Sequence, residues 1–275
     1  TITSGASGIG GVVDFKPDWV VQKIRSGTTQ GAGNWDSTRG FAGANALDWS
    51  DSTVEGTWVG ASSAAYGFVS GVDTNDVSLN DGTTATTGGY VNYNGRTYVL
   101  WNWKAGGEPT ATNSAGAGNT PTAGSVKIDG VNLGSALAGS IPATKLSANT
   151  TAGFCIVTYT GTGSAGTINH GLSATPNCII VMGRNVSNTN VYIQDGIEGV
   201  TDPFTDYIAF GDVNGVLADD ATMWNDVAPD GNVFTVGTGA NTNQNTKTYV
   251  AYLFSNVDGY SKFGSYTGNG DPDGT

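Results

Sequence analysis

The chain has 275 residues, of which 38% are hydrophobic and 12% charged, and its formal net charge is −12. The hydrophobic share excludes a disordered chain, and the acidic balance argues against binding to nucleic-acid phosphates or to anionic membranes. The 43 glycines and the many short apolar runs between turn residues favour an all-β protein. The length suits two domains better than one.

The chain carries an internal duplication. Three blocks recur in the same order with similar spacing, residues 17–25 and 176–184, residues 34–40 and 190–196, and residues 97–103 and 248–254. Their period-2 alternation predicts strands, and Val99, Trp101 and Trp103 fall on one face that we interpret as core. We therefore predict two tandem, related β-sandwich units of jelly-roll type, at residues 1–104 and 149–258.

The segment between the two predicted units has a different composition. Residues 106–119 consist almost entirely of Gly, Ala, Ser, Thr, Asn and Pro, which is typical of a flexible linker. A short strand is expected within 125–133. We assign residues 105–148 to a Gly/Ala/Thr-rich linker with a short strand.

The end of the chain repeats the opening of the second unit. Tyr159-Thr160-Gly161 has a second copy in Tyr266-Thr267-Gly268, and the first unit has no such strand. Residues 259–275 are therefore predicted to form a strand that resembles the start of a further unit. This strand packs on its own unit, or it fills the vacant edge of the first unit, within the chain or in a neighbour. The candidate assembly residues are Phe263, Tyr266, Thr267 and Gly268.

Few residues suggest catalysis or metal binding. The only histidine, His170, lies in a glycine turn and is interpreted as structural, and Cys155 and Cys178 are favoured as free thiols although their pairing is left open. Zinc is excluded by ligand count, and the acidic turns lack the spacing of an EF-hand, so no cofactor is expected and calcium is the one metal left open. We expect no enzymatic activity. A polysaccharide depolymerase is the least favoured alternative.

Tryptophans offer a different function, the binding of carbohydrate. An exposed indole ring can stack on a sugar. The candidate positions are Trp35, Trp49, Trp58 and Trp224.

The second half resembles a known kind of protein. The segment 149–163, the His170-Gly171-Leu172 turn, the strand 248–252 and the following segment 259–270 resemble a repeated β-rich module of unknown function in tail-fibre or appendage proteins of marine tailed phages, cyanophage-like in kind. The resemblance covers most of 149–275 and the first unit more loosely. It implies a multimeric virion component that is assembled in the host cytoplasm.

The expected function follows from these observations together. We expect a non-enzymatic virion structural protein, of the tail-fibre, appendage or capsid-decorating type, that acts in assembly and host attachment. Its expected partners are copies of itself, other virion proteins and a host-surface glycan, with no nucleic acid and no membrane insertion. The alternatives are a carbohydrate-binding adhesin and a strand-exchanging extracellular filament subunit.

Overall fold

The protein is β-rich. The computed structural model describes residues 2–3, 15–26, 31–41, 45–49, 54–56, 68–72, 76–80, 96–187, 190–194, 204–210 and 218–271. Within them, helix is limited to the short helices α1 (Ala221–Trp224) and α2 (Ala240–Asn243), each of 4 residues. The prediction of an all-β protein is therefore confirmed.

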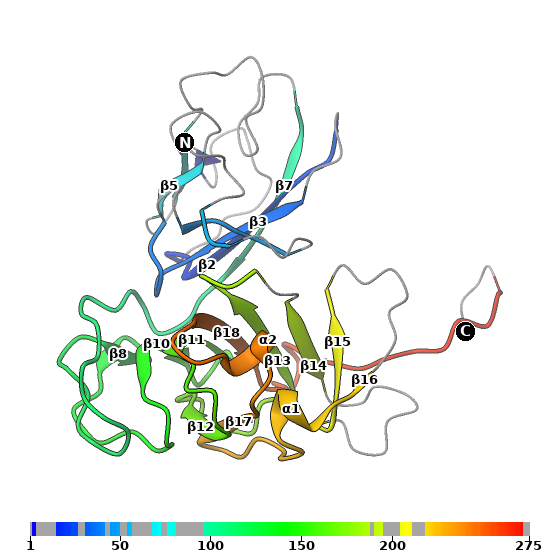
Figure 1. Ribbon diagram of the computed structural model, residues 1–275. Coiled ribbons are helices and arrows are strands. Elements are labelled where there is room, and N and C mark those ends of the chain that lie inside the picture. The colour runs from blue at the N-terminus through cyan, green and yellow to red at the C-terminus, as the bar shows by residue number, and fades with distance from the viewer. Residues whose placement is uncertain are drawn as a thin grey trace.

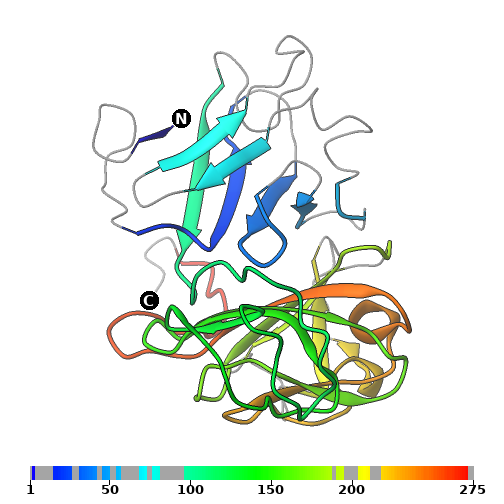
Figure 2. The ribbon, with the colours of Figure 1, turned by 90° about the vertical axis from the view of Figure 1, so that its left-hand side faces the viewer.

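The first half of the chain forms two sheets (Figure 2). A three-stranded sheet has the order β1 (Ile2–Thr3), β6 (Asp76–Asn80), β5 (Phe68–Val72). A four-stranded sheet has the order β4 (Leu47–Asp48), β3 (Ala32–Asp36), β2 (Trp19–Ile24), β7 (Tyr98–Trp103). A cluster around Val20, Trp35 and Val77 joins the two sheets.

The second half is built around a nine-stranded sheet (Figure 1). Its order is β16 (Ala218–Asp219), β15 (Asp206–Ala209), β14 (Val191–Gln194), β13 (Cys178–Gly183), β18 (Thr248–Phe254), β11 (Phe154–Thr160), β10 (Ala143–Asn149), β8 (Val126–Ile128), β9 (Val131–Asn132). The two-stranded sheet of β12 (Gly166–Asn169) and β17 (Val233–Val236), together with α1 and α2, packs on one face.

Both faces of the nine-stranded sheet are buried at its centre, which explains the near-continuous apolar runs of β11, β13 and β18. Cys155, Val157 and Tyr159 of β11 face the β12–β17 side. Phe154 and Ile156 face the four-stranded sheet of the first half. The two halves therefore pack sheet against sheet (Figure 1).

The duplication is visible in the strand pairing. The order β4-β3-β2-β7 of the first half recurs as β15-β14-β13-β18 in the second. The registers of the central pairs also agree, from Trp19↔Trp103 to Ile24↔Tyr98 in one half and from Cys178↔Phe254 to Gly183↔Tyr249 in the other.

The hydrogen bonds that frame the two central strand pairs are equivalent as well. The Asp18 N–H donates to the Trp103 carbonyl (2.8 Å), as the Asn177 N–H does to the Phe254 carbonyl (2.6 Å). At the other end, the N–H groups of Arg25 and Arg184 donate to the carbonyls of Thr97 and Thr248, both at 2.8 Å. The division into two tandem sandwiches at the predicted boundaries stays a prediction.

The middle block of the duplication was matched incorrectly. The sequence match pairs Asn34 with Asn190, and hence Asp36 with Tyr192. In the structure Trp19 lies opposite Asp36, and the equivalent Cys178 lies opposite Gln194, two positions further along. A displacement of two residues keeps every side chain on the same face, so alternation alone cannot detect it.

The segment between the halves is more ordered than its composition suggests. β8 and β10 pair in parallel within the nine-stranded sheet, and the Asn113 amide binds the backbone of Ala143 and Thr122. A Cβ at Gly106 would lie 2.4 Å from the Ala148 carbonyl oxygen, so this glycine permits close backbone packing. The assignment of residues 105–148 to a linker stays a prediction, and its short strand corresponds to β8. Small residues serve close packing here.

In the part of the chain that the structure describes, no helix is long and apolar enough to span a membrane.

Candidate functional site

The most distinctive feature of the molecule is the aromatic layer between its two halves. Trp19, on β2, is only 1% exposed and stacks on Tyr252 of β18 with ring centroids 4.2 Å apart. Phe154 of β11 stacks on Trp19 at 5.6 Å, and Trp103 and Trp49 of the first half lie at 4.3 Å and 5.5 Å. Aromatic rings of this size provide much of the apolar area that holds two packed sheets together.

An ion pair lies at the edge of the aromatic layer. Arg39 follows β3 in a turn, and its guanidinium contacts the Asp36 carboxylate, with both side chains 0% exposed. The other Asp36 oxygen accepts from the backbone N–H of Thr38 (2.9 Å) and of Arg39 (3.0 Å), which fixes the turn. Burial alone would raise the pKa of Asp36, but the Arg39 charge and the hydrogen bonds from Thr38 and Tyr252 hold it below its usual value.

The network continues across the boundary between the halves. The Tyr252 hydroxyl lies 2.7 Å from Asp36 Oδ2, and Arg39 Nη2 donates to the same hydroxyl at 3.1 Å. Glu55 bridges Arg39 (2.9 Å) and Arg184 (2.8 Å), which follows β13. Because a buried charge is costly without partners, this chain of charges favours one relative placement of the two sheets.

The charges of the ionic network are paired with one another. Each carboxylate is opposed by a guanidinium, and burial raises the pKa of Tyr252 well above its usual value, so this hydroxyl remains protonated. Sequence reasoning missed this group as a set. Arg39 and Arg184 both lie in the duplicated blocks, but their shared partner Glu55 lies outside every block.

The predicted glycan-binding tryptophans are mostly in the core. Trp35 is 0% exposed and Trp224 is 1% exposed, so neither ring can stack on a sugar, and this prediction is wrong for both. Trp49 is partly buried between Trp19 and Phe210. Trp58 lies outside the described residues. The three described positions do not come together, since Trp35, Trp49 and Trp224 belong to three separate hydrophobic clusters.

His170 is a buried structural residue. Its Nε2 donates to the carbonyl oxygen of Asp230 (3.1 Å) and its Nδ1 accepts from the backbone N–H of Leu172 (3.2 Å). Burial lowers its pKa to about 4. Both ring nitrogens are therefore occupied by backbone groups, as the structural interpretation expected.

The cysteines are free and buried on opposite sides of one sheet. Cys155 faces the β12–β17 side and Cys178 faces the first half. Burial raises the pKa of Cys178 to about 12 and that of Cys155 well above its usual value. The two thiols do not pair, and both remain protonated at neutral pH.

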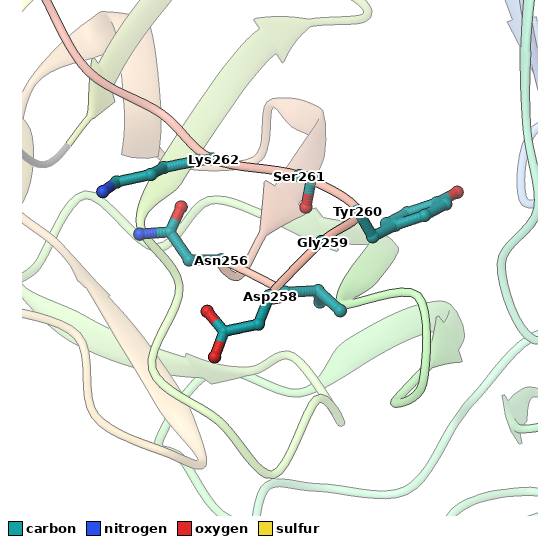
Figure 3. A pocket seen from close by; sticks show the side chains of 7 residues that line it. Asn256, Asp258, Gly259, Tyr260, Ser261 and Lys262 are labelled. Carbon is teal, nitrogen blue, oxygen red and sulfur yellow. The ribbon is translucent and has the colours of Figure 1, made fainter.

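Open hollows lie at two places on the described surface, among others. One, of about 460 Å³, is lined by residues 256–262 of the turn after β18. Figure 3 shows Tyr260 pointing away from the side on which Asn256 and Lys262 lie, so an aromatic ring and polar groups do not converge there. The other, of about 510 Å³, lies between residues 104–107 and the β8–β9 turn. In the described part of the chain no group of three or more His, Cys, Asp or Glu residues could hold a metal ion.

The described part of the predicted C-terminal strand, residues 259–271, does not form a strand. After β18 the described residues, up to 271, contain only an isolated bridge between Val257 and Ser261. Phe263 packs on Phe254 with ring centroids 5.3 Å apart, whereas Tyr266 is 92% exposed. Thr267 and Gly268 are exposed as well. These candidate assembly residues therefore lie on an extended segment that projects from the body (Figure 1).

The fold defines the class of protein, an all-β protein of packed sheets. The buried ionic network that includes Asp36, Arg39 and Tyr252 joins its two halves. The chain belongs to the family described as a domain of unknown function (DUF7483), whose model matches residues 129–275. No curated protein and no solved structure matches the chain. The matched region begins within the predicted linker, so it includes β10 and the rest of the nine-stranded sheet from β9 onward.

Proposed function

We propose that this chain is a non-enzymatic structural protein of a virion, of the tail-fibre, appendage or capsid-decorating type, and that it acts in assembly and host attachment. Its partners in this proposal are copies of itself, other virion proteins and a glycan of the host surface. The resemblance of residues 149–275 to repeated modules of phage appendages motivates the proposal.

The layer between the two halves is the observation that carries the proposal. Trp19, Tyr252 and the Asp36–Arg39 pair hold two sheets in one arrangement through contacts that have no exposed, reactive group. Such a fixed arrangement of two sheets suits a structural protein that must keep its shape under mechanical force. The repeated strand order supports a tandem, sandwich-like design in which related units are added along an appendage.

Attachment to a glycan is the second candidate activity. Trp101 is 46% exposed and Tyr260 is 70% exposed, which leaves aromatic surface available after Trp35 and Trp224 are found in the core. A glycan array tests this activity. Binding that is lost in Trp101→Ala and retained in Tyr260→Ala would assign it to the β7 surface, and an array without any bound glycan would remove it.

The virion assignment is tested by location. Antibodies raised against the purified chain are applied, with gold labels, to particles purified from cultures that express the gene, and the particles are viewed by electron microscopy. We expect label at a repeated position on the particle. Label confined to the particle-free fraction would refute the assignment. Incubation with host polysaccharide should produce no new reducing ends, and their appearance would favour the depolymerase.

A further inference from the structure

We propose that the hollow between residues 104–107 and the β8–β9 turn binds an acidic sugar unit of a host-surface polysaccharide, through the ammonium groups of Lys127 and Lys104. The inference rests on the proposed function in host attachment and names the chemical class of the ligand. It depends on three observations, namely walls that hydrogen bonds hold in place, two lysines without a carboxylate partner among the described residues, and a lining without aromatic rings.

The hollow has the size and the lining of a polar binding site. Its volume of about 510 Å³ lies within the range of about 300–1,000 Å³ that is typical of sites for small ligands. All of its lining residues belong to the continuously described stretch 96–187, so each of its walls is defined. The side chains that can contact a ligand are two lysines and three other polar groups, namely Lys104, Lys127, Asp129, Asn149 and Thr151. Alanine and glycine form the rest of the lining.

The wall formed by residues 104–107 is held by hydrogen bonds. The buried Asp18 carboxylate accepts from the N–H groups of Ala105 (2.9 Å) and Gly107 (3.2 Å). On the other side, the Ser147 hydroxyl of β10 donates to the Gly107 carbonyl at 2.8 Å. This wall is therefore fixed to both halves of the molecule before any ligand binds.

The opposite wall, the β8–β9 turn, is fixed as well. The Asp129 N–H donates to the Ala148 carbonyl at 2.9 Å, and the Asp129 carboxylate accepts from the N–H (2.8 Å) and the hydroxyl (2.6 Å) of Thr150. These bonds tie the turn to the end of β10 and hold the one acidic side chain of the lining in place. A site whose polar groups are already ordered loses little free energy to ordering when a ligand binds.

The two lysines have hydrogen-bond donors left for a ligand. Lys127 lies on β8, and its stem passes close to Gly107, where a Cβ would lie 3.8 Å from Lys127 Cδ. Among the described residues no carboxylate pairs with the ammonium group of Lys127 or of Lys104. Lys104 Nζ donates to the Lys16 carbonyl in a long bond of 3.4 Å. Because the Lys104 charge also acts on the buried Asp18, Lys127 is the main contact and Lys104 the second one.

Charge makes this hollow an exception on the surface. The whole chain carries a formal net charge of −12, so most of its surface repels anions. Two lysines and a single aspartate line the hollow. Low-dielectric walls strengthen the attraction between a charge and a ligand inside a hollow. An anionic group therefore meets less repulsion here than on the acidic surface around it.

The lining also indicates the class of ligand. An ammonium group forms charge-assisted hydrogen bonds with a carboxylate or sulfate, and these are roughly twice as strong as bonds between neutral groups. The Asn149 amide and the Thr151 hydroxyl can bind the hydroxyl groups of a sugar ring. No aromatic residue lines the hollow, so a neutral sugar finds no ring on which to stack. The charge of the sugar is therefore the property that the site can recognise.

Isothermal titration calorimetry of the full chain with the trimer of galacturonic acid tests the site. The fully methyl-esterified trimer is the matched ligand, because it keeps the sugar rings and removes the carboxylate charges. We expect a Kd of about 0.1–1 mM for the acid, since a few contacts in an open hollow give weak association, and binding at least about tenfold weaker for the ester. Equal binding of the two trimers overturns the inference, and so does an acid trimer that does not bind at concentrations up to about 10 mM.

Substitutions assign the binding to the hollow. Lys127→Gln removes the charge and keeps much of the stem, so it should weaken binding about tenfold, whereas Lys127→Arg should stay within about threefold of wild type. Asp129→Asn removes the negative charge of the lining and suits the positive φ of this turn residue, so it should strengthen binding about threefold. Lys262→Gln is the matched control, because Lys262 is exposed, lines the other hollow and carries the same charge. It should bind like wild type.

Unchanged binding in Lys127→Gln overturns the inference, and so does weakened binding in the Lys262→Gln control. Circular dichroism in urea checks that each variant is folded. If Lys127→Gln does not fold, Asp129→Asn decides, because equal or weaker binding in that variant contradicts the site. Gold label on particles without binding of the acid trimer leaves the proposed function standing and removes the site, whereas binding without label leaves only the site.

Discussion

Replacement of Arg39 by Met should strongly destabilise the protein. The Arg39 guanidinium opposes the Asp36 charge, donates to the Tyr252 hydroxyl and pairs with Glu55. Arg39→Met removes all three interactions. Methionine fills much of the same volume, so the main change is electrostatic. The Asp36 carboxylate remains buried with hydrogen bonds from Thr38 and Tyr252 but without a counterion.

The expected loss is about 3–4 kcal/mol of unfolding free energy at pH 7, at the lower end of the cost of breaking a buried ion pair, because the hydroxyl donors remain. The sign of its pH dependence follows from Asp36. Without Arg39, burial raises the pKa of Asp36 above its unfolded value, so the folded state binds a proton more readily than the unfolded state. The deficit relative to wild type should therefore shrink as the pH is lowered from 7 toward 4.

Urea unfolding followed by circular dichroism and tryptophan fluorescence measures this loss. Asp36→Asn keeps the oxygen that fixes the turn and removes the buried charge, so Arg39→Met should cost about 2 kcal/mol less in that background. Lys16→Met breaks only the exposed Lys16–Glu108 pair and should change stability by less than about 0.5 kcal/mol. A loss below about 1 kcal/mol for Arg39→Met, or strict additivity with Asp36→Asn, would refute the reasoning.

Three further predictions concern the core. The pKa of His170 falls from 6.5 to about 4 on folding. The stability that neutral His170 contributes should therefore be fully present above pH 6.5 and decrease by about 3 kcal/mol as the pH falls toward 4. His170→Gln should flatten this pH dependence of the unfolding free energy. Trp19→Ala should cost about 3–5 kcal/mol in urea unfolding, and Trp19→Phe much less because the indole N–H is buried without a hydrogen-bond partner among the described residues. Cys155 and Cys178 should resist a thiol reagent until urea unfolds the chain; rapid labelling of the native protein would contradict their burial.

Much of the architecture could be predicted from local patterns. Alternation and β-branched residues identify strands such as 178–183 and 248–254, because side chains of a strand alternate between two faces. The order of the repeated blocks also predicted which strands correspond. The composition of 106–119 does not distinguish a mobile linker from close backbone packing, because small residues suit both, and Gly106 is an example of close packing.

The polar cluster was beyond local reasoning. Asp36, Arg39, Glu55, Arg184 and Tyr252 are spread over most of the chain, and no spacing rule joins them. Their meeting depends on how one sheet lies on another. For the same reason, Trp35 and Trp224 look like binding residues in the sequence and prove to be core.

The sequence by itself determined an all-β chain, its internal duplication, and the recurrence of Tyr159-Thr160-Gly161 at residues 266–268. These properties are local, since they depend on alternation and on the order of similar segments along the chain. Only the tertiary structure decided which face of each sheet is covered, which charges meet at the boundary, and that β11 lies beside β18. Those properties depend on contacts between segments far apart in the chain, and the free energy of such contacts is set by burial, which a strand acquires only when another sheet packs against it.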